Sequence, residues 1–178
     1  MFTAKTGGGN TTKKKEKKTA TLKRLKNYAL WLLARQGYTE KELRRKLSTT
    51  YPDGTAFNNE VIEYCQHYDY INDKKFAEAY VRSLLSQKMG INKIKQKMYT
   101  KGFSADDITE AISGDEVLAH DFFTQALALK QRRYGDAPLK EPKLKQKALN
   151  YLIRKGFDFS LILGVLSYNP LSEEDEID

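Results

Sequence analysis

The sequence has few of the residues from which most catalytic sites are built. Its 178 residues include one cysteine, two histidines and four prolines. A single cysteine, Cys65, excludes an intramolecular disulfide, and its place three residues after Ile62 on an expected helix predicts a buried, unreactive side chain. His67 and His120 lack the spacing of metal ligands. Nucleophile-elbow, Walker and dinucleotide-binding motifs are absent, so we predict a non-enzymatic protein without metal or cofactor.

Long apolar runs and alternating apolar patterns are also absent from the sequence. No stretch approaches the roughly 20 apolar residues that span a membrane, and residues 1–26 lack the apolar segment of a secretion signal. We therefore expect no membrane partner and a cytoplasmic location. Because no segment alternates apolar and polar residues as a half-buried strand does, the fold class predicted is all-α.

Charge of one sign dominates each end of the chain. The net charge is +8, and residues 1–26 carry nine Lys or Arg against one acid. Residues 171–178 carry five acids and form a predicted acidic tail. Residues 1–20 have almost no apolar side chain to bury, so we predict a disordered basic arm. Such an arm either solubilises the chain or contacts nucleic acid, and the overall balance favours an anionic partner.

The segment 69–112 contains the pattern that the rest of the chain repeats. Apolar residues recur every three or four positions from Asp73 to Lys88, which predicts an amphipathic helix. We expect Gly90 to end this helix in the left-handed conformation. A second, basic helix carries Ile94 and Met98 one turn apart, and a glycine closes it at position 102.

The start of the third helix of this segment occurs three times in the chain. Each copy has a phenylalanine, a capping residue directly after it and an isoleucine five positions on: Phe57, Asn58 and Ile62; Phe103, Ser104 and Ile108; Phe157, Asp158 and Ile162. In such a hydrophobic staple the two apolar side chains pack across the first helical turn. The spacings of 46 and 54 residues predict a repeated three-helix unit, with three unrelated helix starts as the alternative.

Extended to the whole chain, the pattern predicts nine helices in three tandem three-helix repeats at 21–71, 72–114 and 115–170. Gly37 is expected to end the first helix, and a capping box at Thr39 and Glu42 to start the second. One long helix is expected from about Glu116 to Tyr134. Because each unit alone is too small to bury a core, we expect the units to lean on their neighbours in an elongated, curved array.

The middle helix of each predicted unit surrounds a narrow apolar seam with basic side chains. Three equivalent helices in a stacked array would align these side chains into a basic strip that attracts phosphates or an acidic protein groove. The alternative is three ordinary solvated helix faces. The candidate partner-binding residues are Arg44, Arg45, Lys46, Lys93, Lys95, Lys97, Lys101, Lys143, Lys145, Lys147, Arg154 and Lys155.

Several short motifs, taken in their order along residues 27–112, resemble the RecX family of RecA recombinase regulators. The matching residues are Ala29-Leu30, Arg35, Tyr38, Glu42-Leu43, Lys46-Leu47, Tyr70-Ile71-Asn72-Asp73, Phe76-Ala77, Gly90, Ile94, Lys101-Gly102-Phe103 and Ile108. The third unit has the helical plan without a diagnostic signature. The lysine-rich arm and the acidic tail lie outside the family pattern.

The resemblance implies a monomeric array of three-helix repeats that lies in the helical groove of the RecA–single-stranded DNA filament. There it would restrain filament growth, ATP hydrolysis and strand exchange without catalysis, by bridging protomers and competing for groove surface. Direct contact with single- or double-stranded DNA is a further possibility of the family. The alternative function is an autonomous nucleic-acid-binding helical protein with a basic arm.

Overall fold

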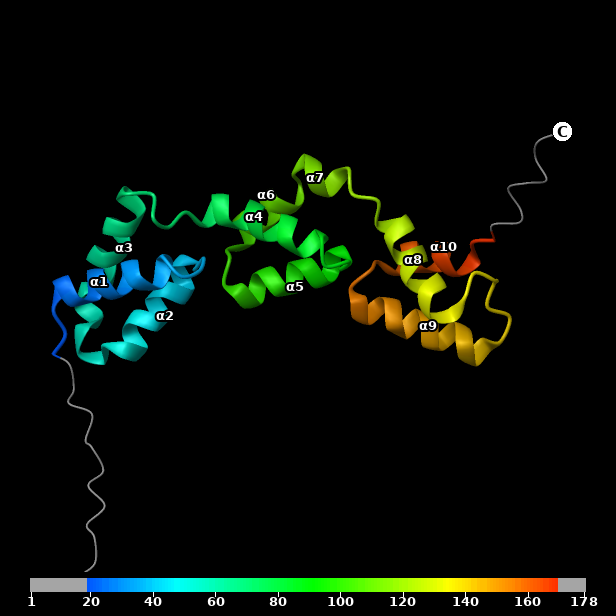
Figure 1. The fold of residues 1–178 in the computed structure, drawn as a ribbon, viewed down its shortest axis with the longest axis horizontal. Helices are drawn as coiled ribbons and strands as arrows, with labels where there is room; N and C mark the ends of the chain where they lie inside the picture. The colour runs from blue at the N-terminus through cyan, green and yellow to red at the C-terminus, as the bar shows by residue number, and fades with distance from the viewer. Residues whose placement is uncertain (1–18, 170–178) are drawn as a thin grey trace, which may run out of the picture.

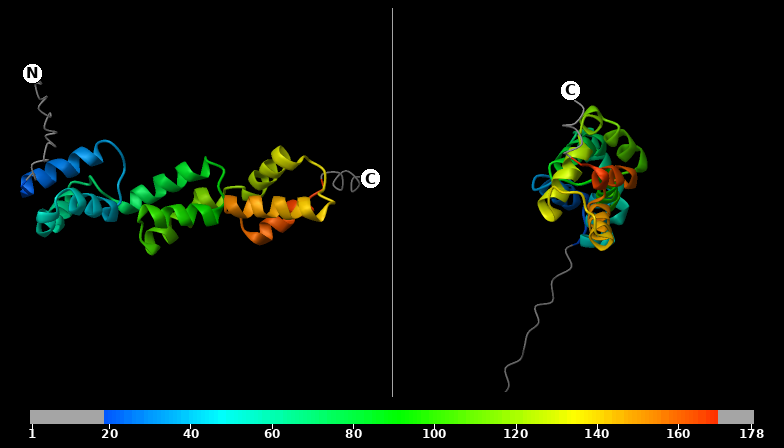
Figure 2. Two further views of the ribbon diagram at one scale, coloured as in Figure 1. Left: turned by 90° about the horizontal axis from the view of Figure 1, so that it is seen from below. Right: turned by 90° about the vertical axis from the view of Figure 1, so that its right-hand side faces the viewer.

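The computed structural model describes residues 19–169, so the acidic tail and nearly all of the basic arm lie outside the described residues. Within this range the chain is all-α, and its helices form three tandem units in an elongated row that bows slightly in the view of Figure 1. Figure 2 shows the same row from below and end-on. The predicted all-α array is confirmed. Ten α-helices and one 3-10 helix replace the expected nine helices in the described range.

The first unit contains α1 (Leu22–Leu33), α2 (Glu40–Thr50), η1 (Pro52–Phe57) and α3 (Asn58–His67). The predicted capping box starts α2, because the Thr39 hydroxyl accepts a hydrogen bond from the Glu42 amide and the Glu42 carboxylate accepts one from the Thr39 amide. The unit buries Leu25, Ala29, Leu32, Leu43, Leu47, Val61, Ile62 and Cys65. The expected burial of the cysteine is confirmed.

The second unit contains α4 (Asp73–Leu85), α5 (Ile91–Lys101) and α6 (Ala105–Ile112), and the short α7 (Asp115–Leu118) follows it. Gly102 takes the left-handed conformation at the end of α5, as predicted. The predicted capping residue Ser104 starts α6, where it forms a capping box with Asp107. The buried apolar side chains are Ala77, Val81, Leu84, Leu85, Ile94, Met98, Phe103, Ile108, Ala111 and Val117.

The third unit contains α8 (Phe122–Tyr134), α9 (Pro142–Lys155) and α10 (Phe159–Ser167). Its core is formed by Ala126, Leu129, Ala148, Leu152, Phe157, Ile162, Val165 and Leu166. Lys130 is buried as well, and its ammonium donates hydrogen bonds to the carbonyl oxygens of Asp136 and Ala137 at 2.9 and 3.0 Å. These bonds attach the loop before α9 to α8 and satisfy a buried charge.

Two glycines have roles that differ from the predicted ones. Helix α1 ends at Leu33, before Gly37, and a Cβ atom at Gly37 would lie 2.5 Å from the ring of Phe76. Gly90 has φ −73°, so it does not end α4 in the left-handed conformation; Lys88 has the positive φ of 55° instead. Gly90 allows a close backbone contact with the third unit, and Gly37 leaves room for the Phe76 ring of the second unit.

One predicted helix cap and one predicted helix start are also wrong. Asn58 lies inside the helical conformation, because η1 leads directly into α3, and its side-chain amide donates to the Ser48 hydroxyl at 2.8 Å instead of capping the helix. The expected long helix of the third unit is interrupted after Leu118. There Asp121 accepts a hydrogen bond from the Thr124 amide at 2.9 Å and starts α8 as a new helix.

The three units have separate cores, which corrects the expectation that each unit needs its neighbour to bury apolar surface. The buried apolar residues of the described range fall into three clusters, one for each unit. Phe122 is a limited exception, since its half-buried ring packs against the second and third clusters. The units therefore meet mainly through polar and backbone contacts.

Replacing Phe103 by Ala should destabilise the protein by about 3–5 kcal/mol, because the ring is only 4% exposed and packs against Phe76 and Tyr80. Phe57→Ala is the matched control. The half-buried ring of Phe57 contributes less to its core, so its loss should cost clearly less. Urea denaturation of both variants measures the difference, and equal losses would show that the three staples contribute alike.

Candidate interaction surface

The middle helices of the three units, α2, α5 and α9, follow one another end to end along the row (Figure 1). At each junction the carboxyl end of the later helix meets the amino end of the earlier one. All three helices therefore run in the same direction, and their dipoles align head to tail. We call this arrangement the middle-helix row.

The junction between the second and third units is made by backbone atoms. The Gly90 amide donates to the Lys155 carbonyl and the Asn92 amide to the Gly156 carbonyl, both at 3.0 Å. The first free N–H groups of α5 thus satisfy the last carbonyls of α9. The backbones approach so closely that a Cβ atom at Gly90 would lie 2.3 Å from the Gly156 carbonyl carbon. No residue other than glycine fits there without a shift of the backbone.

The junction between the first and second units uses side chains. The Thr39 hydroxyl, fully buried, donates to the Lys101 carbonyl at 3.0 Å. The Lys101 ammonium lies 2.9 Å from a Glu42 carboxylate oxygen and donates to the Gly37 carbonyl at 3.2 Å. The Asp73 carboxylate accepts a bifurcated hydrogen bond from the Glu40 N–H, with its two oxygens at 3.0 and 3.2 Å, and so caps α2 from the neighbouring unit.

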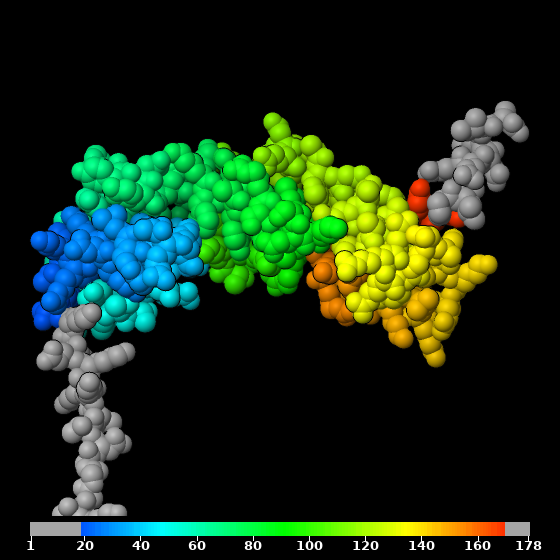
Figure 3. All heavy atoms as spheres, in the orientation of Figure 1, coloured from blue at the N-terminus to red at the C-terminus, as the bar shows by residue number. Residues whose placement is uncertain are grey.

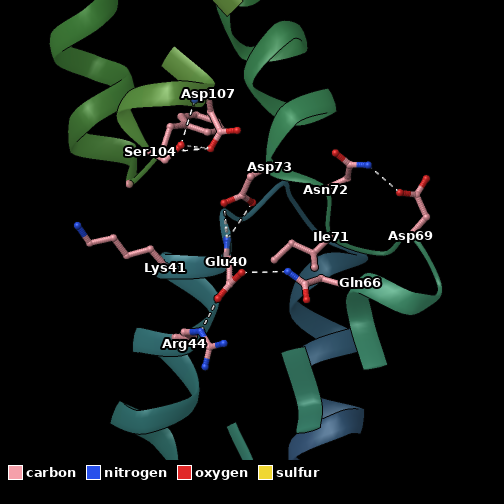
Figure 4. A pocket seen from close by; sticks show the side chains of 12 residues that line it. Glu40, Lys41, Arg44, Gln66, Asp69, Ile71, Asn72, Asp73, Ser104 and Asp107 are labelled. Carbon is pink, nitrogen blue, oxygen red and sulfur yellow. Dashed lines mark hydrogen bonds and ion pairs between the residues drawn. The ribbon is translucent and has the colours of Figure 1, made fainter. Parts of the chain in front are cut away.

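A polar pocket of about 730 Å³ lies beside this first junction (Figure 4). The Asp73 carboxylate points at the amino end of α2, and Glu40 lies between Arg44 and Gln66, at 2.6 and 3.0 Å. Burial raises the pKa of Asp73 above its ordinary value of 3.8, against the opposing effect of the Glu40 N–H. The nearby carboxylates, with Asp107 first, raise it further.

All twelve predicted basic residues lie on the three helices of the middle-helix row, but they differ in whether they form ion pairs. Ten of the twelve form no ion pair with a described residue: Arg45, Lys46, Lys93, Lys95, Lys97, Lys143, Lys145, Lys147, Arg154 and Lys155. The other two, Arg44 and Lys101, pair with Glu40 and Glu42. These two cations are therefore engaged within the protein, and the free positive charge is concentrated on α5 and α9.

The structure adds residues that the sequence interpretation did not select. Arg133 on α8 lies with its guanidinium carbon 4.7 Å from the ring centroid of Tyr151 on α9. Both residues line a cleft with Lys93 and Arg154, two of the predicted cations. Arg133 lies outside the middle helices, so a search confined to those helices could not find it. Only the arrangement of α8 against α9 brings it to the row.

These features define the class of protein: an all-α tandem-repeat protein whose middle helices are joined end to end. Figure 3 shows that the units abut along the row. No helix in residues 19–169 is long and apolar enough to cross a membrane. Family models match three successive segments, described as the first, second and third three-helix domains of RecX, at residues 26–65, 72–112 and 120–166.

Relatives and solved structures agree with these matches. A protein named Regulatory protein RecX from Clostridioides difficile is 36% identical over 86% of this chain and 70% of its own length. A relative of that name from Clostridium perfringens is 34% identical, over 75% of this chain and 63% of its own length. The crystal structure of RecX from Lactobacillus salivarius superposes with a TM-score of 0.66, at 26% identity, over 88% of this chain and 97% of that one.

The chain belongs to the RecX family. The names of its relatives support a regulatory role.

Replacing Gly90 by Ala should destabilise the protein by about 1–3 kcal/mol, because the added Cβ overlaps the backbone of Gly156. Gly114→Ala is the control. Gly114 has a similar extended conformation at a helix start, but its Cβ would only reach the Ala111 carbonyl at 3.4 Å. The control should change stability by less than about 0.5 kcal/mol in urea denaturation. Similar effects of the two substitutions would contradict the close backbone junction.

Asp73→Asn should remove part of the pH dependence of folding. Because the pKa of Asp73 is higher in the folded state than its ordinary value of 3.8, the folded state binds this proton more tightly. Its contribution is therefore most favourable below pH 3.8 and is lost as the pH rises from there through the folded-state pKa. The stability difference between wild type and variant, followed by urea denaturation from acid to neutral pH, should change in this window. A difference independent of pH would contradict the raised pKa.

Proposed function

We propose that this protein binds the RecA–single-stranded DNA filament and modulates its growth, ATP hydrolysis and strand exchange. Membership of the RecX family and the regulatory names of the relatives support the proposal. The observation that carries it is the middle-helix row, whose ten free cations lie along one elongated body. A filament offers a long, repeating surface to such an elongated body.

The proposed action is non-catalytic and takes place in the cytoplasm. A monomer lying in the filament groove contacts more than one recombinase protomer, so it resists the changes of protomer spacing that growth and strand exchange require. Attraction between the row and the anionic groups of the filament brings the protein to the groove, and salt weakens this attraction. The three units then act as connected contact sites, each raising the local concentration of the next.

The second candidate function is autonomous binding of nucleic acid. The same ten free cations favour it, since a basic surface attracts phosphates with or without a recombinase. The two candidates differ in one measurable ratio. At physiological salt a filament regulator binds the assembled filament much more tightly than bare single-stranded DNA, whereas an autonomous binder does not.

Replacing Lys93, Lys95 and Lys97 by Glu should weaken filament binding by at least about tenfold and flatten its salt dependence, because three cations are lost from the row. The control replaces Lys74, Lys75 and Arg82 of α4 by Glu, an equal change of charge off the row. That control breaks surface ion pairs with Glu110, Asp69 and Glu116, which contribute little to stability.

Binding is measured by pull-down and fluorescence anisotropy with recombinase assembled on single-stranded DNA and ATP. Circular dichroism checks that both triple variants remain helical. Unaltered binding by the row variant, or an equal loss in the control, would remove the middle-helix row from the proposal.

A further inference from the structure

A small cleft beside the second junction gathers positive charge from two units. It has a volume of about 370 Å³ and is lined by Met89, Lys93, Arg133, Tyr151, Arg154 and Lys155. We call it the cationic cleft. Lys93 comes from α5, Arg133 from α8 and the remaining cations from α9, so the cleft exists only because the second and third units are joined.

The charges of the cationic cleft are not neutralised within the described part of the protein. Four cations line it without a carboxylate, and none of them forms an ion pair with a described acid. The Lys93 ammonium donates to the amide oxygen of Gln96 at 2.7 Å, which is a neutral partner. Like charges gathered in one cleft repel one another, and a bound anion relieves this repulsion.

The adjacent junction holds two of the cations in position. A Cβ atom at Gly156 would lie 2.3 Å from the Cβ of Lys93, so the backbone of α9 directly contacts the base of that side chain. The Lys155 carbonyl is bonded to the Gly90 amide at 3.0 Å. Binding at the cationic cleft therefore requires little ordering of backbone, which lowers its entropic cost.

Arg133 and Tyr151, which both line the cleft, contact each other. The Arg133 guanidinium lies over the Tyr151 ring, and the Tyr134 ring meets that of Tyr151 edge-on with centroids 6.2 Å apart. Unpaired bases stack on tyrosine rings and on guanidinium planes, whereas the bases of a duplex are already stacked on each other. The planar guanidinium of arginine can also donate two parallel hydrogen bonds to phosphate oxygens, which the ammonium of lysine cannot do.

We propose that the cationic cleft binds the phosphodiester backbone of single-stranded DNA, with an adjacent base stacked against the Arg133–Tyr151 pair. Arg133 and Arg154 donate to phosphate oxygens, and Lys93 and Lys155 add positive charge. This assignment deepens the second candidate function, on which it rests, because it places the binding of bare DNA on named residues at one junction.

The test uses the full-length chain and a short fluorescent oligothymidylate, with binding followed by anisotropy over a range of salt concentrations. The variant Arg133→Gln/Arg154→Gln removes two exposed cations and should bind at least about tenfold more weakly. The slope of log affinity against log salt should fall by about 1.4, which is two phosphate contacts at about 0.7 each.

The matched control is Lys74→Gln/Lys75→Gln, with the same loss of charge on α4. Both residues are exposed, and they lie off the middle-helix row and outside the lining of the cleft. This control should retain nearly wild-type affinity. No loss in the cleft variant, or an equal loss in the control, would overturn the assignment.

Two further experiments distinguish between the possible ligands. If the cleft variant loses as much affinity for a blunt duplex as for oligothymidylate, the single-strand assignment is wrong. If a polyglutamate peptide displaces wild-type protein from oligothymidylate as well as an unlabelled oligonucleotide of equal charge does, the cleft takes acidic protein segments instead. The wild-type protein could bind DNA through the cleft and yet not bind the filament. That result would contradict the proposed regulation of the filament, but it would still support the assignment of the cleft.

Discussion

The elongated shape depends on the end-to-end contact of the middle helices. Each isolated helix leaves N–H groups unpaired at one end and carbonyls at the other. Here the carbonyls of Lys155 and Gly156 accept from the first amides of α5, and the Lys101 carbonyl accepts from the Thr39 hydroxyl at the start of α2. Because the units have separate cores, these few bonds fix one unit against the next and align the helix dipoles along the row.

The two junctions use different chemistry, and their sensitivity to conditions differs accordingly. The first contains ionisable groups, since Glu42 pairs with Lys101 and the half-buried Asp73 caps α2. Its strength therefore changes with pH and salt. The second is made by backbone amides and carbonyls around Gly90 and Gly156, which do not titrate in water. The hydrogen bonds that join the second and third units are therefore independent of pH, whereas the repulsion between the cations of the cationic cleft depends on salt.

Local sequence patterns could predict most helices but not the contacts between units. Capping boxes at Thr39 and Ser104 and left-handed Gly102 involve residues a few positions apart, so their chemistry is visible in the sequence. The roles of Gly37 and Gly90 were missed because the atoms that exclude a Cβ, in Phe76 and in 156–157, are distant in the chain. Arg133 was missed for the same reason. The basic residues could be chosen from the sequence by their charge. Whether each of them forms an ion pair depends on neighbouring residues that only folding brings close.

Helices α5 and α9 carry lysines in their first turns, where the helix dipole favours acids. Acids at a helix amino end are stabilising and cations are unfavourable there, by about 0.3–1 kcal/mol each. Helix α2 follows this rule with Glu40 and Glu42 in its first turn, but α5 and α9 have no acid there. Lys93 and Lys143 occupy those first turns instead. Two neighbours offset this unfavourable charge: Glu141 is the N-cap of α9, and the carbonyl groups at the carboxyl end of α9 abut the amino end of α5 beside Lys93.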